Sequence, residues 1–436
     1  MNAPATGNST TSVTVAYNDY SPITMQTFDG ANGTGTLLGE VTAAPSIQLG
    51  KANTIDLTVV GIATSATLSV VPNQPLLVGD ATAGYTLLGD QPELFDLVLK
   101  DADGNVILTD RPQFITAGAS TVGAGYANAS GSQISFFGVG LSSGYEDISL
   151  QFQNPDGTTL SLPPVKIKDE PLVAVINGAT NTISMFDGNG NAVALPSPSF
   201  QGLVHPTALT YDPCLRTLVV ADAGANTLRL YGEDGETYPY TVGPFTGISN
   251  PVALSLNVLD ADYLVANAGD DTVSSYYTNG PQFAPYSWTH TPSALACLNA
   301  CVQQVLLSSD GSATIINDQA PIPPNAFAGL NDPTGVIGDE PPNTLMYIVN
   351  HGNNTITTYD TTGAPVPVTG SFPGLSQPFG IAYNPSQSGM LVTNEATNAV
   401  TAYDLQGNAM ALSPGAFAGL QSPTAIFGIG IGQCFY

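Results

Sequence analysis

The sequence predicts an all-β protein with two main parts: an N-terminal immunoglobulin-like β-sandwich and a six-bladed β-propeller closed by the C-terminal strand. Two observations carry this prediction. From Leu172 onward, one motif recurs six times with a period in the low forties, which is typical of propeller blades. Before it, short alternating strands are separated by turn residues, and no useful helical period occurs.

Residues 1–48 form the first segment, a possible assembly segment. Residues 1–11 consist mainly of Ser, Thr, Asn, Gly and Ala, so we expect a flexible tail. Alternation begins at Val13–Tyr17. This segment therefore holds either the first strands of the sandwich or a small separate β unit.

Residues 49–168 are predicted to form the sandwich. Ile55–Val59 alternates, and Asp101–Gly104 and Pro155–Gly157 lie between strand-like runs as hairpin turns. Short strands at this spacing are typical of an immunoglobulin-like sandwich, although the Cys…Trp…Cys marks of true immunoglobulins are absent. Leu162–Pro171 is rich in proline, so we expect a stiff linker there.

Residues 169–436 are predicted to form the propeller. One half of each repeat reads Phe-x-Gly-Leu-x-x-Pro-x-Ala, and its prolines fall at 206, 251, 292, 333, 378 and 423, in steps of 45, 41, 41, 45 and 45 residues. The other half is an apolar strand ending in Asn or Asp, a short loop and Asn-Thr-Ile. The chain enters this region in the second half and leaves it in the first, so we expect the last strand to complete the first blade.

Two of these second halves carry a resemblance. Leu391–Val400 and Tyr347–Ile356 resemble NHL and YVTN propeller repeats, and the resemblance covers about residues 172–436. It implies the propeller fold. That family includes surface proteins, lyases, lactonase-like enzymes and binding modules, so the resemblance leaves the activity open.

One polar residue per repeat ends the apolar strand: Asn177, Asp222, Asn267, Ser309, Asn350 and Asn394. Propeller lactonases, which this fold resembles, hold Ca²⁺ with such side chains, so a calcium cofactor and a metal site at Asp222, Asn267, Asn350 and Asn394 are one interpretation. Asn and Asp also cap tight turns, and a feature shared by all blades is expected to build the blade. We favour this structural role and predict no catalytic residue. Glu395, directly after Asn394, departs from the pattern.

The third and fourth repeats are irregular: the steps that lead to them are 41 residues, and the copy at Pro292 lacks the repeat Phe. His290 and the single tryptophan, Trp288, lie there, and His205, like His290, lies just before its repeat proline. These three side chains are candidate binding residues, and the two imidazoles could approach each other. Ordinary exposed loop residues are the alternative.

The four cysteines all lie in the repeat region: Cys214, Cys297, Cys301 and Cys434. A disulfide between Cys297 and Cys301 would close a local turn, and one between Cys214 and Cys434 would fasten the chain end to the next blade. Four cysteines allow three pairings, so the pairing stays open. Free thiols and a metal site are the other interpretations.

The composition restricts partners and location. Seven Lys and Arg face 34 Asp and Glu, a net charge of −27, so we expect no nucleic-acid partner. No apolar run of about 18 residues exists, so no membrane insertion is predicted. Only 9% of residues are charged, against roughly 25% in an ordinary globular protein, which favours an extracellular or cell-surface protein. Met1–Pro4 does not resemble a signal peptide.

These observations lead to a functional hypothesis. We expect a secreted, non-enzymatic structural or adhesive protein of the microbial cell surface, a subunit of an extracellular filament or surface layer. Subunits would form a homo-polymer by β-strand addition, and the propeller would project to bind surface glycans or proteins. Two alternatives stay open: a calcium-dependent propeller lactonase or lyase, and a glycan- or peptide-binding module.

Overall fold

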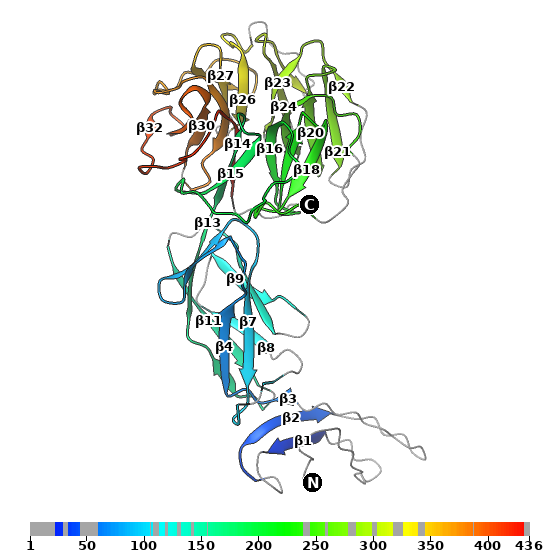
Figure 1. The fold of residues 1–436 in the computed structure, drawn as a ribbon, viewed down its shortest axis with the longest axis vertical. Coiled ribbons are helices and arrows are strands. Elements are labelled where there is room, and N and C mark those ends of the chain that lie inside the picture. Colours follow the sequence, from blue (N-terminus) through cyan, green and yellow to red (C-terminus); the bar gives the residue numbers. More distant parts are fainter. Residues whose placement is uncertain are drawn as a thin grey trace, which may run out of the picture.

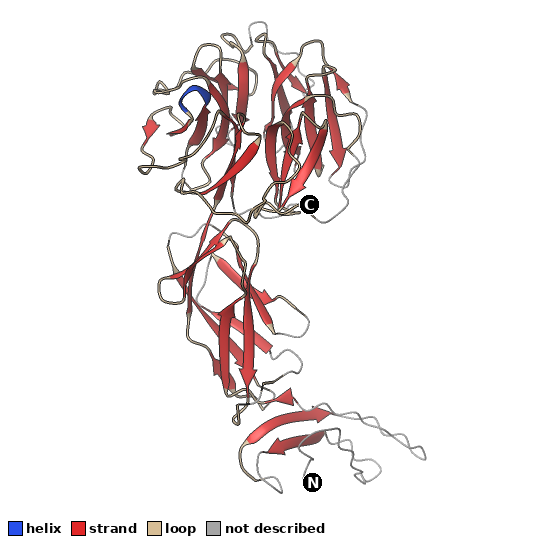
Figure 2. Ribbon diagram, viewed as in Figure 1, coloured by secondary structure: helices blue, strands red, loops and turns tan. Residues whose placement is uncertain are grey.

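The computed structural model describes most of the chain beyond residue 21. The described residues are 22–28, 34–43, 60–104, 106–107, 113–117, 121–128, 132–140, 144–154, 156–238, 245–257, 260–277, 285–298, 303–316, 326–338, 345–386 and 388–430. They form an all-β chain in three successive units, with the N-terminal sheet and the propeller at opposite ends (Figure 1). A single 3₁₀ turn, Glu395–Thr397, is the one helical element among them (Figure 2).

The first unit is a three-stranded antiparallel sheet of its own, in the order β1 (Ile23–Phe28), β2 (Leu37–Ala43) and β3 (Val60–Gly61). Of the two alternatives for residues 12–48, the structure therefore has the separate β unit. The tail at 1–11 and the runs Val13–Tyr17 and Ile55–Val59 lie outside the described residues.

The second unit is the expected β-sandwich. One sheet has the order β4 (Ser65–Val70), β7 (Glu93–Lys100), β10 (Gln133–Gly138) and β9 (Val122–Tyr126). The other has the order β12 (Thr159–Ser161), β11 (Glu146–Gln153), β13 (Val165–Glu170), β6 (Gly84–Leu88) and β5 (Leu77–Asp80), with β8 (Gln113–Ala117) also paired to β11.

The core of the sandwich lies between these two sheets. Alternate residues of β7, such as Phe95 and Leu97, meet Leu150 and Phe152 of β11 in one buried cluster. Both hairpins are present as predicted. Lys100 and Val106 pair on either side of the Asp101–Gly104 turn, and Gln153 and Thr159 pair on either side of the second turn.

The predicted linker at Leu162–Pro171 is wrong. Most of it is β13, which pairs with β11 and runs parallel to β6. Ile167 is fully buried in the sandwich core, so the alternating pattern of this segment reflects a strand with one face inward. Pro171 alone separates β13 from the first propeller strand, so the sandwich extends to Glu170.

The third unit is a β-propeller. Within the described residues it has six antiparallel sheets, numbered here as blades 1 to 6. Blade 1 contains β15 (Thr182–Asp187), β14 (Leu172–Asn177) and β33 (Pro423–Ile429); blade 2 contains β16 (Pro206–Asp212), β17 (Thr217–Asp222) and β18 (Thr227–Tyr231); blade 3 contains β19 (Pro251–Asn257), β20 (Asp262–Asn267), β21 (Thr272–Tyr277) and β22 (Tyr286–Ser287). Blade 4 contains β23 (Pro292–Leu298), β24 (Gln303–Ser308) and β25 (Ala313–Ile316); blade 5 contains β26 (Pro333–Gly338), β27 (Leu345–Asn350) and β28 (Thr355–Asp360); blade 6 contains β29 (Pro378–Tyr383), β30 (Met390–Asn394), β31 (Ala399–Tyr403) and β32 (Ala409–Met410).

The ring closes as the repeat predicted. The C-terminal strand β33 pairs with β14, the first propeller strand, with Leu172 opposite Ile429. The inner strands β16, β19, β23, β26, β29 and β33 each contact the next, and β33 contacts β16. Closure removes the two open blade edges that an incomplete ring would present.

The repeat Phe packs each blade against the loop that enters it. Phe327 contacts Tyr359 with ring centroids 5.2 Å apart, and the Tyr359 hydroxyl donates to Ala328 O at 2.9 Å. The same pairing of ring and hydroxyl recurs at Tyr231, Tyr276 and Tyr403. This tie occurs in four of the five repeats that have the Phe; in blade 1 the repeat Phe417 packs against Phe186 instead.

Candidate functional site

The polar residues that end the second strand of each blade lie at one end of the ring, called here the distal face. β14 starts beside Pro171 and the sandwich and ends at Asn177, so the distal face points away from the sandwich (Figure 1). In every blade the repeat proline pairs with the strand-ending residue, as Pro251 does with Asn267. In blade 4 this partner is Ser308, so Ser309 was placed one residue too far along the chain.

The Asn side chains of this ring are committed to hydrogen bonds within their own blades. Asn350 is fully buried; its Oδ1 accepts from Asn331 N at 2.9 Å, and its Nδ2 donates to Thr357 Oγ1 at 3.0 Å. Equivalent bonds occur at Asn177, Asn267 and Asn394. These amides therefore tie the end of the second strand to the loop before the proline, and they do not point their oxygens at a shared metal position.

Blade 2 uses a charged version of the same tie. Asp222 accepts from Val204 N at 3.1 Å and from His205 N at 2.9 Å, and Arg229 Nε lies 3.0 Å from its Oδ2. Burial alone would raise the pKa of Asp222, but the hydrogen bonds from His205 and Arg229 hold it below its ordinary value. Seven residues after the strand end, blade 2 has Arg229, whereas the blades that end this strand in Asn have Ser or Thr. The two positions therefore change together from blade to blade.

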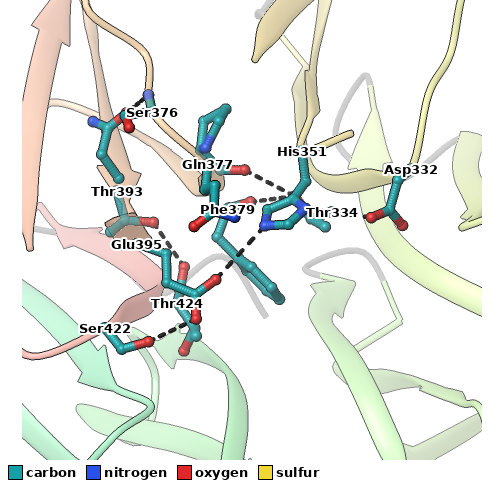
Figure 3. Close-up of polar contacts among 12 residues, drawn as sticks. Asp332, Thr334, His351, Ser376, Gln377, Phe379, Thr393, Glu395, Ser422 and Thr424 are labelled. Atoms are coloured by element: carbon teal, nitrogen blue, oxygen red, sulfur yellow. Dashed lines mark hydrogen bonds and ion pairs between the residues drawn. The ribbon is translucent and has the colours of Figure 1, made fainter. Parts of the chain in front are cut away.

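The symmetry of the distal face breaks in blades 5 and 6. The residue after the strand-ending position is small in the first four blades, where it is Gly178, Ala223, Ala268 and Ser309. In blades 5 and 6 it is His351 and Glu395. Figure 3 shows the His351 ring between two carboxylates, those of Asp332 and Glu395.

The His351 cluster joins three blades. His351 Nδ1 lies 3.3 Å from Asp332 Oδ2, and Nε2 lies 3.6 Å from Glu395 Oε2. Glu395 Oε1 accepts from the Ser422 hydroxyl of blade 1 at 2.7 Å. The Phe379 ring contacts the imidazole edge-on at 5.9 Å. The side chains of His351, Asp332 and Glu395 are 23%, 44% and 34% exposed, so a ligand can reach them.

In this cluster both imidazole nitrogens face carboxylates, and the Ser422 hydroxyl donates to Glu395 rather than to His351. These residues therefore do not form the Ser–His pair that activates a serine nucleophile. The two carboxylates lie on opposite sides of the ring and do not converge. In the part of the chain that the structure describes, no group of three or more His, Cys, Asp or Glu could hold a metal ion.

A central channel of about 280 Å³ opens between the inner strands of all six blades. Its wall is formed by Thr, Ser, Gly and apolar residues and contains no charged side chain. The residue after the repeat proline reaches across to the next blade: Thr334 Oγ1 donates to Phe379 O at 2.9 Å, and Ser293 Oγ donates to Pro333 O at 2.6 Å. Any channel ligand would therefore meet hydroxyls, main chain and apolar groups.

The predicted binding residues do not form one site. His205 Nδ1 lies 3.3 Å from Asn181 Oδ1, whereas His290 Nδ1 lies 2.9 Å from Asp310 Oδ2, so the two imidazoles have different partners. The rings of Trp288 and His290 are in contact, with centroids 5.3 Å apart. Trp288 also packs against a buried cluster of blades 3 and 4. The sequence pointed to this sector, whereas the clustered titratable groups lie on blades 5, 6 and 1, where Glu395 had been noted but its pairing with His351 had not been predicted.

The two described cysteines are Cys214, in the turn after β16, and Cys297, near the end of β23. Neither is a free thiol. Cys301 and Cys434 lie outside the described residues, so the pairing stays a prediction. Among the described residues, no helix is long and apolar enough to span a membrane.

No protein-family model matches the chain, and no curated protein sequence matches it. Among solved structures, it is similar to a chain in a crystal structure of a nidogen/laminin complex, with a TM-score of 0.45 and 13% identity over 61% of this chain and 100% of that one. It is also similar to a structural-genomics protein of unknown function from Bacteroides thetaiotaomicron, with a TM-score of 0.45 and 12% identity over 84% of this chain and 95% of that one. At these scores neither likeness carries an argument about function.

Proposed function

We propose that the protein is a non-enzymatic structural or adhesive component of the microbial cell surface, a subunit of an extracellular filament or surface layer. Copies join at the N-terminal sheet by β-strand addition, and the propeller projects as a binding module. We further propose that the propeller belongs with the NHL and YVTN repeats, on the residues at Tyr347–Ile356 and Leu391–Val400.

The observation that carries this proposal is the edge strand β1. In the sheet order β1-β2-β3 it lies at the edge, and within the described residues only β2 pairs with it. Its sequence, Ile-Thr-Met-Gln-Thr-Phe, contains no charge and no proline. Soluble proteins usually protect exposed edge strands with charged residues or proline, because an unprotected edge offers unpaired main-chain groups to another strand. Strand addition is an established mode of subunit assembly.

The arrangement of the units supports the projecting propeller. The N-terminal sheet and the propeller lie at opposite ends of the molecule (Figure 1). The distal face, with the accessible His351 cluster, points away from the sandwich. A chain assembled at β1 would therefore leave this face open to glycans or proteins of another surface.

The cysteines and the composition support an extracellular location. Neither described cysteine is a free thiol, and disulfides persist in oxidising compartments. We propose the pairs Cys297 with Cys301 and Cys214 with Cys434. Peptide mapping without reduction tests them, and a mixed pair such as Cys214 with Cys301 would contradict them.

The assembly experiment introduces a charge on the β1 edge. Gln26 faces Glu40 across the hairpin, so Gln26→Lys keeps a cross-strand partner while adding the charge that protects natural edges. We expect the unaltered protein to form oligomers or filaments in sedimentation and negative-stain images, and Gln26→Lys to remain monomeric.

The matched control is Thr67→Lys on β4, another uncharged edge strand with an exposed threonine. It should assemble normally. If the unaltered protein stays monomeric at all concentrations, and deleting residues 1–11 changes nothing, the assembly hypothesis fails. If Thr67→Lys rather than Gln26→Lys blocks assembly, the edge is wrongly assigned.

A further inference from the structure

The sandwich and the propeller meet in a packed joint. Pro171 is the only residue between β13 and β14. Leu76 and Leu88 of the sandwich belong to one buried cluster with Leu172 and Tyr211 of the propeller. The contact is therefore apolar at its base and holds the two units in one orientation.

A carboxylate of the propeller bridges the joint. Glu233, after β18, is fully buried, and it accepts hydrogen bonds from two main-chain N–H groups of the sandwich. Asp90 N lies 3.1 Å and 2.9 Å from its two oxygens, and Gln91 N lies 3.2 Å from Oε2. A Cβ on the preceding Gly89, where φ is +81°, would clash with this carboxylate, so the close approach requires glycine.

Three further buried carboxyl groups lie at the joint: Asp90 and Asp169 interact with Glu233, and Glu93 interacts with the neighbouring Asp234. Asp90, Asp169 and Glu93 are 2%, 1% and 5% exposed. The side chain of Asp169 lies against Gly138, where a Cβ would clash with it. Around these carboxyl groups, acidic side chains outnumber basic ones. Asp234 and Glu170 are the other acids. The basic groups are Lys168, which pairs with Glu170, and Arg216. The Tyr211 hydroxyl is the other titratable group that faces the cluster.

We propose that this joint is a pH-sensitive switch, rigid when its buried carboxyl groups are protonated and loosened when they ionise. Several carboxylates cannot all ionise in one buried site without a large cost in free energy. The joint avoids that cost in two ways: the groups stay protonated, or the two units separate and hydrate them.

The pKa values place the transition near neutral pH. Burial, with the charges of Asp90 and Glu233, raises the pKa of Asp169 to about 8. Burial raises the pKa of Glu233 to about 7, and burial with the charge of Asp234 raises that of Glu93 to about 7. Burial also raises the pKa of Asp90 to about 6, although Arg216 opposes the shift.

The sign follows from these raised values. A carboxyl group with a raised pKa in the packed joint binds its proton more tightly there than in the separated state, where its pKa is roughly 4. Packing is therefore fully stable at low pH. It weakens as the pH rises through the range from about 4 to about 8, and ionisation is complete above that range.

Small-angle X-ray scattering in line with size exclusion measures the joint in the full chain. We expect one rigid arrangement to fit the data at pH 5 and a mixture of orientations at pH 8.5, with a midpoint between pH 6 and 8. The double variant Glu233→Gln, Asp169→Asn should stay rigid at both values, because the Gln side chain can still accept the bonds from Asp90 and Gln91. Asp103→Asn, in an exposed hairpin turn, is the matched control and should respond as the unaltered protein does.

Three results would overturn the proposal. The first is scattering of the unaltered protein that does not change between pH 5 and pH 8.5, a result that needs no variant to fold. The second is a double variant that keeps the full pH response. The third is loss of the response in Asp103→Asn, which would assign the effect to net charge rather than to the joint. The size-exclusion step separates the monomer from any assembly, so these results are independent of whether the protein assembles.

Discussion

The buried amide of Asn350 offers a direct test of how the blades are held together. Asn350→Ala removes the acceptor for Asn331 N–H and the donor to Thr357 Oγ1. It also leaves a small cavity beside fully buried strands. Since the same tie recurs in three other blades, the result applies to the repeat as a whole.

The expected loss follows from these contacts. A buried hydrogen bond contributes about 1 kcal/mol, and a partner left unsatisfied costs about 1–3 kcal/mol. The Asn331 N–H belongs to an exposed residue and can bind water, so we expect a loss of about 2–3 kcal/mol. In a domain of this size, 1 kcal/mol shifts Tm by roughly 2–4 °C, so the propeller transition should fall by about 4–12 °C.

Differential scanning calorimetry resolves this transition, and Asn353→Ala is the control. Asn353 is exposed in the next loop, where its Oδ1 accepts only from Thr355 Oγ1 within the described contacts. It should change the unfolding free energy by under about 0.5 kcal/mol. An Asn350→Ala protein within that same margin would refute the view that these amides hold the blade.

Further outcomes follow from the geometry. Arg229→Ala should destabilise the propeller by about 3–5 kcal/mol because it leaves the buried carboxylate of Asp222 without its cation. The paired variant Asp222→Asn, Arg229→Ser should restore stability because it recreates the Asn–Ser hydrogen bond of blades 1 and 3. Because the pKa of Asp222 is lowered in the folded protein, its ionised carboxylate stabilises the propeller above about pH 4, and this stabilisation is lost as the pH falls through the folded pKa. The paired variant lacks this carboxylate, so it should lose less stability in calorimetry at about pH 3. Tyr359→Phe should cost about 1 kcal/mol in chemical denaturation, since it removes only the bond to Ala328 O, and a loss above about 3 kcal/mol would contradict that reading. Dialysis against a calcium chelator should leave Tm unchanged, because the amide oxygens of the ring already accept main-chain hydrogen bonds; a clear fall would revive the calcium interpretation.

Much of the fold was predictable because each sequence repeat corresponds to the strands of one blade. The prolines set the blade count, and the half-repeats at the two ends predicted the pairing of β33 with β14. The segment Val165–Glu170 was missed because its two lysines and the prolines on either side of it resemble a linker. Its parallel partner β6 lies about 80 residues earlier, and such pairing leaves no local signal.

The candidate site was less predictable. The position of the strand-ending Asn ring was predicted correctly, except that in blade 4 Ser308, the first of two adjacent serines, and not Ser309 pairs with the repeat proline. The His351 cluster combines residues from three blades; Glu395 had been noted as a departure from the pattern, but no single repeat shows that it meets His351. Comparing repeats column by column would have shown it, because His351 and Glu395 replace small residues. The acidic joint had no signal, since it depends on packing between two different folds.

Closure of the ring by its last strand has a consequence for biosynthesis. Asn177 and Gln421, which bond in blade 1, are 244 residues apart in the chain. Blades 2 to 6 consist of consecutive segments and can form as they leave the ribosome, whereas β14 must wait for the final strand. Such a distant contact carries a large loop-closure cost and makes the last step of folding slow. A chain that stops before β33 would therefore present an open first blade.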